Sequence, residues 1–187
     1  MQESPEQDIL ENEPEIVEQA KKDDQAFEIL YHHYFPKIYG YIFKRVGNHE
    51  TTEDIVSITF VKVFTNLSKY NNKGYTFGAW VYKIATNNLV DHYRKQGRNK
   101  EVGIEEANEI KDESLTPEDQ VQISQDKESI KVIINKLPKR YQKVLNLKFF
   151  AELSITEIAH VMDISENNSR VLTFRALKKF HKLYEKH

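Results

Sequence analysis

The chain has 187 residues, with 27 Lys and Arg against 29 Asp and Glu, and a formal net charge of −2. It contains no Cys, which excludes disulfide frameworks, thiolate zinc sites and cysteine nucleophiles. Its 6 Gly and 5 Pro are too few for a fold of many short strands joined by turns. No apolar run approaches the roughly 18 residues that span a bilayer, and the acidic start differs from a secretory signal. These features predict a soluble, cytoplasmic, mainly helical protein without membrane insertion.

The small net charge hides four blocks of alternating sign. Residues 1–24 hold nine acids and two bases, and residues 25–100 hold five acids and eleven bases. Residues 101–129 then hold ten acids and two bases, and residues 130–187 hold five acids and twelve bases. Lys- and Arg-rich blocks favour a polyanionic partner, because the cations displace counterions from phosphates. Solvated lysine-rich helix faces are the plain alternative, so charge alone does not decide between that reading and nucleic-acid binding.

The N-terminal half reads as three helices. Apolar residues at helical spacing run from Ile16 to Gly47, and Pro36 is expected to kink or interrupt this stretch. Thr51 and Asp54 resemble a capping box that opens a second helix.

A third helix is expected from about Phe77 to near Gly97, after a loop rich in Asn and Lys. Its aromatic residues are interleaved with cations and amides, which suits single-stranded nucleic acid. A core role for Trp80 remains the favoured alternative, whereas Asn87 favours function because consecutive amides lower helix propensity in mid-helix.

The rest of the chain also predicts helices. Thr116 and Pro117 have the pattern of a helix start, and that helix is expected to reach Leu137, before Pro138 opens the next. No strand candidate is found, so the predicted fold class is all-α, with two small helical domains joined by an acidic linker. The expected segments are an acidic N-terminal extension at 1–19, a helical domain at 20–97, a linker at 98–129 and a second helical domain at 130–187.

Residues 154–180 have the pattern of a helix-turn-helix. Ser154 and Glu157 form a capping box, a short helix follows, and a turn near Asp163 leads into a longer helix. The apolar side of that longer helix is predicted to carry Val171, Phe174, Leu177 and Phe180. In this motif the second helix enters the major groove with its N-terminal end first. An ordinary helical hairpin with a basic face remains the alternative.

Motifs of catalysis and cofactor binding were sought and are missing. The sequence has no Gly-rich phosphate loop, no Gly-x-Ser-x-Gly elbow and no His-Glu-x-x-His pair. Glu157 and His160 give a single Glu-x-x-His, which does not make a di-iron site. We therefore expect no enzyme activity, no catalytic residue, no metal and no cofactor.

The combination of segments resembles an extracytoplasmic-function (ECF) sigma factor of the sigma-70 family. Residues 24–31, 53–64 and 77–94 resemble the second conserved region of sigma factors, and residues 137–147 and 154–180 resemble the fourth. The resemblance implies a protein that binds core RNA polymerase, reads the −35 element and melts the −10 element of promoter DNA. A stand-alone helix-turn-helix regulator is the alternative function.

The resemblance also implies roles for particular residues. The domain at 20–97 would bind core polymerase and the −10 element, including the melted nontemplate strand, and the domain at 130–187 would bind the double-stranded −35 element. An anti-sigma factor becomes a candidate partner, and the location becomes cytoplasmic, with the nucleoid. The expected −10 contacts are Tyr70, Lys83 and Asn87; the expected −35 contacts are Asn168, Arg170, Phe174 and Arg175; the expected polymerase contacts are Asp54, Ile55, Ile58, Phe60, Val61 and Phe64.

Overall fold

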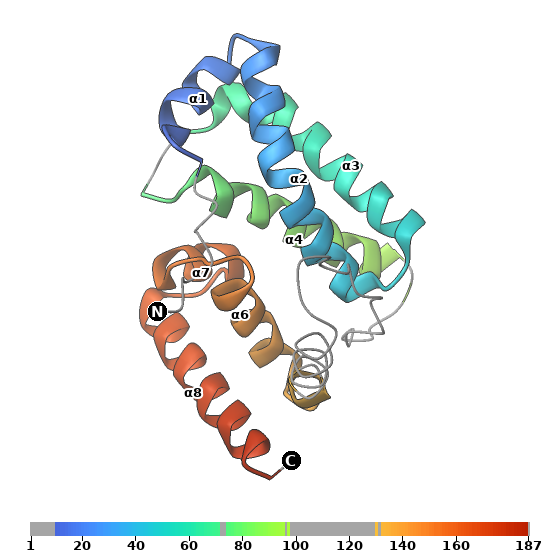
Figure 1. The fold of residues 1–187 in the computed structure, drawn as a ribbon, viewed down its shortest axis with the longest axis vertical. Helices are drawn as coiled ribbons and strands as arrows, with labels where there is room; N and C mark the ends of the chain where they lie inside the picture. The colour runs from blue at the N-terminus through green and yellow to red at the C-terminus, as the bar shows by residue number, and fades with distance from the viewer. Residues whose placement is uncertain (1–9, 72–73, 96, 98–129, 131, 187) are drawn as a thin grey trace, which may run out of the picture.

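A computed structural model describes residues 10–71, 74–95, 97, 130 and 132–186 of the chain. Every regular element in these ranges is a helix, so the all-α prediction is confirmed for the described part of the chain. The helices form two groups, which we call the N-terminal module (residues 10–97) and the C-terminal module (residues 130–186). Figure 1 shows helix α4 of the N-terminal module lying next to the C-terminal module. The expected linker at 98–129, with the helix start at Thr116, lies outside the described residues.

The N-terminal module contains α1 (Glu13–Ala20), α2 (Asp24–Val46), α3 (His49–Asn66), the short 3-10 helix η1 (Leu67–Lys69) and α4 (Phe77–Lys95). Helices α2, α3 and α4 pack on one another around a shared core, and α1 closes one end of it (Figure 1). Part of the segment expected as an acidic extension thus contributes a helix to this module. Core side chains are drawn from all of these elements: Val17, Leu30, Ile38, Ile42, Val56, Val63, Leu67, Val81 and Ala85.

The start of α3 differs from the expected capping box. The cap is Asn48, whose side chain accepts a hydrogen bond from the Thr51 backbone N–H at 2.9 Å. Asn is among the best N-cap residues because its side-chain oxygen satisfies a free N–H of the first turn. Gly47, with φ of 69°, ends α2 just before it. The sequence placed the start three residues late because Thr51 also fits a capping pattern.

Pro36 lies inside an uninterrupted α2, so the expected break is absent. Proline costs a helix one hydrogen bond and a steric contact, but a helix held on both sides by tertiary packing can continue through it. Tyr34 and Ile38, on either side of Pro36, are both buried in the core. Packing of α2 against α3 and α4 therefore outweighs the local preference.

The C-terminal module contains α6 (Lys139–Phe149), α7 (Ile155–Met162) and α8 (Glu166–Tyr184), and residues 130 and 132–135 ahead of α6 are also helical. Ile158 and Val161 of α7, with Ala176 of α8 and Leu147 of α6, are almost fully buried where the helices meet. The two modules also share apolar contacts, because their buried side chains form one continuous cluster. No helix in the described ranges is long and apolar enough to cross a membrane.

Candidate nucleic-acid and polymerase interfaces

The helix-turn-helix of the C-terminal module is held by side-chain to backbone hydrogen bonds. Ser154 and Glu157 form the expected reciprocal capping box at the start of α7. Ser165 caps α8 by accepting from the Asn168 backbone N–H, and the buried Ser169 hydroxyl donates to the Ile155 carbonyl of α7 at 3.0 Å. These bonds fix the angle between α7 and α8, so the first turn of α8 is presented as a rigid unit.

The turn between α7 and α8 contains a residue with left-handed backbone geometry. Asp163 has φ of 54° and ψ of 48°, a conformation that Gly adopts most easily and that Asn and Asp tolerate better than other residues. Its backbone N–H bonds back to the last turn of α7. The absence of Gly at this position therefore does not prevent the motif from forming.

The first turns of α8 carry the residues expected to contact −35 DNA. Asn168, Arg170, Phe174 and Arg175 are all exposed, and the Phe174 side chain is 67% accessible. Within the described part of the chain, no ion pair holds either arginine. The structure thus brings these four residues together on one accessible helix, as the spacing predicts.

The predicted apolar side of α8 is wrong in its register. Val171, Phe174 and Leu177 are exposed, and Phe180 is half-buried. The side that packs on α6 and α7 instead carries smaller or polar residues, namely Ser169, Leu172, Thr173 and Ala176. Helices that approach closely need small side chains at the contact, so size rather than hydrophobicity decided which side faces inward.

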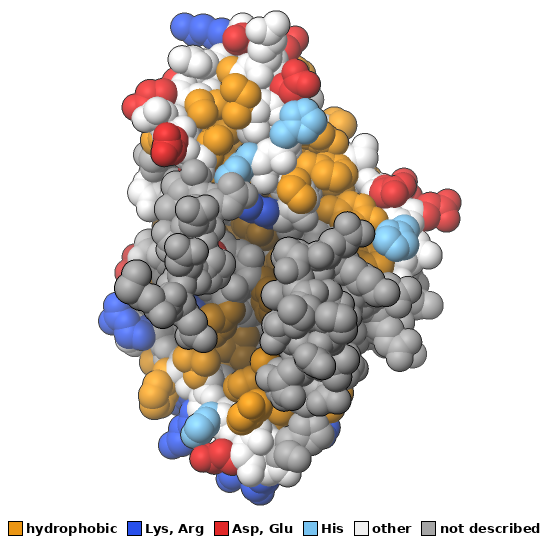
Figure 2. Space-filling model, viewed as in Figure 1, with side chains coloured by type: hydrophobic (Ala, Val, Ile, Leu, Met, Phe, Trp, Pro, Cys, Tyr) orange, Lys and Arg blue, Asp and Glu red, His pale blue; other side chains and the backbone are white. Residues whose placement is uncertain are grey.

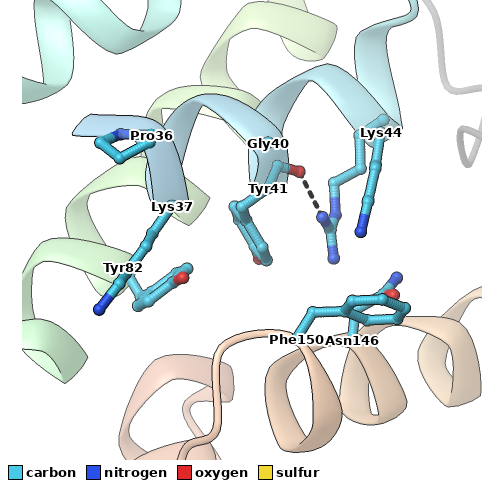
Figure 3. A pocket seen from close by; sticks show the side chains of 9 residues that line it. Pro36, Lys37, Gly40, Tyr41, Lys44, Tyr82, Asn146 and Phe150 are labelled. Atoms are coloured by element: carbon cyan, nitrogen blue, oxygen red, sulfur yellow. Dashed lines mark hydrogen bonds between the residues drawn. The ribbon is translucent and has the colours of Figure 1, made fainter. Parts of the chain in front are cut away.

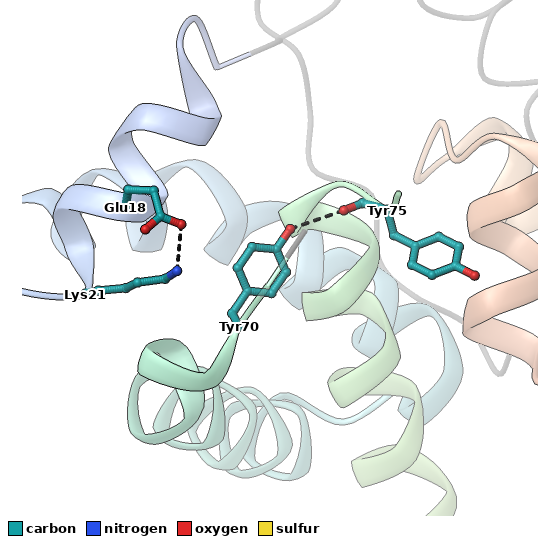
Figure 4. Close-up of polar contacts among 4 residues, drawn as sticks. All are labelled: Glu18, Lys21, Tyr70 and Tyr75. Atoms are coloured by element: carbon teal, nitrogen blue, oxygen red, sulfur yellow. Dashed lines mark hydrogen bonds and ion pairs between the residues drawn. The ribbon is translucent and has the colours of Figure 1, made fainter. Parts of the chain in front are cut away.

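The −10 candidate Tyr70 belongs to an aromatic cluster between η1 and α4. Its ring lies 4.9 Å from the Trp80 ring and 5.4 Å from the Phe77 ring. Its hydroxyl donates to the Tyr75 carbonyl at 3.2 Å, as Figure 4 shows beside the Glu18–Lys21 ion pair of α1. Burial and nearby carboxylates raise the pKa of Tyr70 to about 12, so the ring stays neutral.

A cavity of about 430 Å³ opens beside this cluster, at the ends of α3 and α4. Lys62 and Lys69 supply cations, Tyr70 and Trp80 supply aromatic walls, and His160 enters from α7. Aromatic faces next to ammonium groups are the chemistry that binds an unstacked base and its phosphate. Trp80 is half-buried and lines the cavity, so it is neither a purely core residue nor fully exposed.

The two consecutive amides of α4 have different environments. Asn87 is exposed, whereas Asn88 is buried and donates from Nδ2 to the Thr59 hydroxyl at 2.9 Å. The Oδ1 atom of Asn88 accepts from the Lys62 ammonium group at 2.5 Å. Asn88 therefore has a structural role in joining α4 to α3, and Asn87 is left free for a partner.

The third −10 candidate, Lys83, is not accessible in this arrangement. Its ammonium group forms an ion pair with Asp163 at the turn of the helix-turn-helix, and its side chain is only 15% exposed. The same contact between α4 and α7 contains a ring stack of Tyr75 on His160, with centroids 4.2 Å apart. We call this set of contacts the α4–α7 contact.

Glu157 completes the α4–α7 contact. Its carboxylate accepts hydrogen bonds from the Thr76 backbone N–H and hydroxyl in addition to those of its own capping box. Burial alone would raise the pKa of Glu157, but the hydrogen bonds from Thr76 and Ser154 outweigh it and lower the pKa. Burial and the Lys83 charge lower the pKa of His160. Sequence analysis missed this contact because it joins residues about 80 positions apart, and only the Glu157 cap was visible locally.

The expected polymerase contacts divide into exposed and buried residues. Ile58, Val61 and Phe64 are exposed apolar side chains on α3, with accessible fractions of 50%, 59% and 48%. Asp54 is also exposed, whereas Ile55 and Phe60 are in the core. Phe64 contacts Phe27 of α2, and the centres of the two rings lie 4.9 Å apart. The sequence could not separate these groups because both sides of α3 are apolar.

Figure 2 shows hydrophobic side chains exposed on one face of the N-terminal module. Together, the helix-turn-helix with an exposed first turn and the aromatic and cationic cavity are typical of an all-helical DNA-binding protein, and α3 carries a separate exposed apolar face. No group of three or more metal-binding side chains occurs in the described ranges.

Comparison with known families identifies this class more closely. Residues 30–99 match the family Sigma-70 region 2, and residues 127–180 match the family Sigma-70, region 4. The chain is 33% identical over 159 residues to the ECF RNA polymerase sigma factor SigW of Bacillus subtilis (strain 168), covering 79% of this chain and 83% of SigW. The chain therefore belongs to the sigma-70 family, as an ECF sigma factor.

Other relatives agree with this assignment. The chain is 32% identical to the ECF RNA polymerase sigma factor BldN of Streptomyces coelicolor (strain ATCC BAA-471 / A3(2) / M145), covering 90% of this chain but 64% of BldN. The sigma factor RpoE of Bartonella quintana, solved in complex with the anti-sigma factor NepR, has a TM-score of 0.65 at 18% identity, covering 85% of this chain and 96% of RpoE. That likeness concerns the fold. The family favours a promoter-directing sigma factor over a stand-alone regulator.

Proposed function

We propose that this chain binds core RNA polymerase through α3, recognises −35 DNA through α8 and opens the −10 element with α4 and the cavity beside it. The observation that carries the proposal is the first half of α8, where exposed amide and guanidinium groups stand on a helix fixed by its cap. Arg and Asn side chains at that position suit direct reading of base edges in the major groove.

The −35 contacts have distinct tasks in this proposal. Arg170 and Asn168 lie nearest the N-terminal end of α8 and would reach base edges, since they can form paired hydrogen bonds. Arg175 lies further along the helix and would contact phosphates, which fixes the register without reading sequence. Phe174 offers an exposed ring for apolar contact with a thymine methyl group.

The −10 proposal rests on the cavity lined by Tyr70 and Trp80. Extruding a base costs a few kcal/mol, and stacking on an aromatic ring returns about 1–3 kcal/mol per base. Lys62 and Lys69 at the cavity rim would hold the phosphates of the displaced strand. Asn87 is exposed and lies seven residues after Trp80 on α4, so it would contact the next nucleotide.

The polymerase proposal rests on Ile58, Val61 and Phe64. Three exposed apolar side chains at i, i+3 and i+6 give α3 a continuous face, and such a face marks a protein-docking site. Asp54, one turn before Ile58, would add a charged contact at the edge. Ile55 and Phe60 would act indirectly, by holding α3 in place from within the core.

In this proposal the α4–α7 contact must separate before the −10 element is bound. In the described arrangement the C-terminal module pairs Lys83 with Asp163 and places His160 in the wall of the cavity. Polymerase would separate the modules because it would hold them at a distance set by the spacing of the two promoter elements. Once one module is bound, the other would bind at a high effective concentration, which would favour this separation. An anti-sigma factor would have the opposite effect by holding them together. In the cell the protein would work in the cytoplasm, on the nucleoid.

The test is transcription in a purified system. The full chain and core polymerase are incubated with a library of promoter fragments, and start sites are sequenced. We expect specific starts that Val61→Ser reduces by weakening polymerase binding, while the exposed control Val90→Ser leaves polymerase binding unchanged. Tight duplex binding by the protein alone, with no transcript from any fragment, would support the stand-alone regulator instead.

A further inference from the structure

A second cavity, of about 200 Å³, lies between α2 of the N-terminal module and α6 of the C-terminal module. Its walls include the rings of Tyr41, Tyr82 and Phe150, and Asn146 of α6 lies beside Phe150. Figure 3 shows Lys44 projecting from α2 toward Phe150 and Asn146. The cavity is therefore bordered by both modules and is separate from the one proposed for the −10 base.

Three cations of α2 line this cavity, Lys37, Lys44 and Arg45, and among the described residues neither Lys44 nor Arg45 has an acidic partner. The Lys44 ammonium group lies 3.7 Å from the centre of the Phe150 ring, and the Arg45 guanidinium lies 3.7 Å from the centre of the Tyr41 ring. Arg45 donates from Nη1 to the Tyr41 carbonyl at 2.5 Å. Its Nη2 atom is fully buried and has no hydrogen-bond partner among the residues that the structure describes. A buried donor of a charged group without a partner is costly, and native structures rarely leave one.

Further positive charge surrounds the same junction. Burial and the neighbouring charges of Arg45 and Lys83 lower the pKa of Lys143, on α6, to about 8. Burial and Arg45 also lower the pKa of Lys44. Among the described residues, Asp163 is the acid that offsets this effect on Lys143; it is ion-paired with Lys83, and its own side chain is 79% exposed. Within the described part of the chain, the junction thus gathers five cations from three helices, Lys37, Lys44, Arg45, Lys83 and Lys143, near the exposed carboxylates of Asp163 and Glu152.

We propose that the cavity between α2 and α6 binds a small phosphate-type anion, of the size of orthophosphate or pyrophosphate. The guanidinium of Arg45 offers a free donor and Lys44 a point charge, the two groups that recognise phosphate oxygens in proteins. A volume of about 200 Å³ is below the roughly 300 Å³ where pockets for larger organic ligands begin. The anion would offset the charge repulsion at the junction.

The position of the cavity gives the anion an effect on module arrangement. A ligand that touches both α2 and α6 binds the closed arrangement and not the separated one, so it stabilises closure by linkage. Any effect on transcription would rest on the function proposed above. The binding experiment does not use polymerase or DNA, so its failure and the failure of that function can be told apart.

The experiment follows thermal unfolding of the full chain in sodium pyrophosphate and, separately, in orthophosphate, each against sodium chloride of equal ionic strength. With the anion at about a hundred times its dissociation constant, we expect the midpoint to rise by about 5 °C, and calorimetric titration to give one site per chain. Lys44→Gln and Arg45→Gln should remove most of this rise. No rise with either anion at about 10 mM would overturn the proposal.

Two further variants separate this site from other basic surfaces. Lys178→Gln removes the same charge from an exposed position on α8, and its response to pyrophosphate should equal that of the unchanged protein. Lys143→Gln should weaken the response while leaving the anion-free midpoint equal or higher, because it relieves repulsion at the junction. Loss of the response in Lys178→Gln but not in Lys44→Gln would mean adventitious binding to the DNA-facing helix and would overturn the proposal.

Discussion

The two surfaces that we propose to contact DNA differ in what determines their accessibility. On α8, all four candidate contacts are exposed, and the helix is positioned by bonds within its own module. On α4 and η1, one candidate is exposed, one is packed in an aromatic cluster and one is ion-paired to the other module. The proposed −35 surface is therefore fully exposed in the described arrangement, whereas access to the proposed −10 surface depends on how the modules are arranged.

This difference implies an order of events. A chain in the described arrangement could present α8 to duplex DNA at once, since duplex contacts need no rearrangement of the C-terminal module. Capture of a displaced strand needs Lys83 and the cavity beside Tyr70, and both are partly covered by α7. Melting would thus be coupled to separation of the modules, so single-strand binding would not occur before polymerase has engaged both.

The largest expected effect comes from removing a core side chain beneath the proposed −35 surface. Ile158 of α7 is fully buried, and Ile158→Ala should destabilise the C-terminal module by about 2–5 kcal/mol through lost burial and a cavity. Chemical denaturation followed by circular dichroism measures the loss. The matched control is Ile58→Ala on α3, which removes a half-exposed isoleucine and should cost less than about 0.5 kcal/mol. Equal costs for the two would contradict the burial pattern.

The next effect should appear on the −35 surface alone. Arg170→Ala removes a base-reading group from an exposed position, so discrimination between the preferred −35 sequence and its single-base variants should fall by about 1–3 kcal/mol at one position. A binding selection with holoenzyme measures it. Lys178→Ala, further along α8, should weaken all sequences alike. Unchanged sequence preference in Arg170→Ala would remove this residue from the proposed site.

Features of these surfaces that depend on local signals could be predicted from the sequence. The α7–α8 motif was predicted because its signals are local: the capping box at Ser154 and Glu157 and the turn near Asp163 all lie within ten residues. The family resemblance then gave the partners, and the comparisons confirm it. Local signals also misled, at Thr51 and at Pro36, where a better cap or tertiary packing prevailed.

What the sequence could not give depends on residues distant along the chain. Lys83 was expected to face DNA, and nothing near it indicates Asp163 as a partner. The face of α8 was misassigned because Ala176 and Ser169 are small rather than strongly apolar, and their burial follows from the close approach of α7. Burial of Ile55 and Phe60, beside exposed Ile58 and Val61, likewise needs the position of α2 and α4.

A smaller effect should separate the two amides of α4. Asn88→Ala removes the hydrogen bonds to Thr59 and Lys62, so it should lower the free energy of unfolding by about 1–3 kcal/mol. Asn87→Ala should leave unfolding unchanged within about 0.5 kcal/mol and instead slow promoter opening, measured by permanganate reactivity of unpaired thymines. If Asn87→Ala reduced polymerase binding as much as opening, its proposed contact with the melted strand would be wrong.

The smallest expected effect concerns pH and the α4–α7 contact. In this contact the pKa of His160 is lowered, first by burial and then by Lys83, whereas separation of the modules returns it to its ordinary value near 6.5. As pH falls through that value the separated form binds the proton more readily, so acid should favour separation, and pH above about 7.5 should have no effect through this group.

Fluorescence energy transfer between dyes can measure that separation, because the chain has no native Cys to interfere. With labels at Lys22→Cys and Lys179→Cys, both exposed, transfer should fall between about pH 7.5 and 5.5. His160→Gln should flatten this range. It should leave a second fall at pH values below 4.5, the ordinary pKa of a Glu, because the lowered pKa of Glu157 means that its carboxylate stabilises the contact only while it is ionised. If energy transfer depended on pH in the same way in His160→Gln and in the unchanged protein, protonation of His160 would not affect its stacking on Tyr75. The α4–α7 contact would then depend on Glu157 and Lys83 alone.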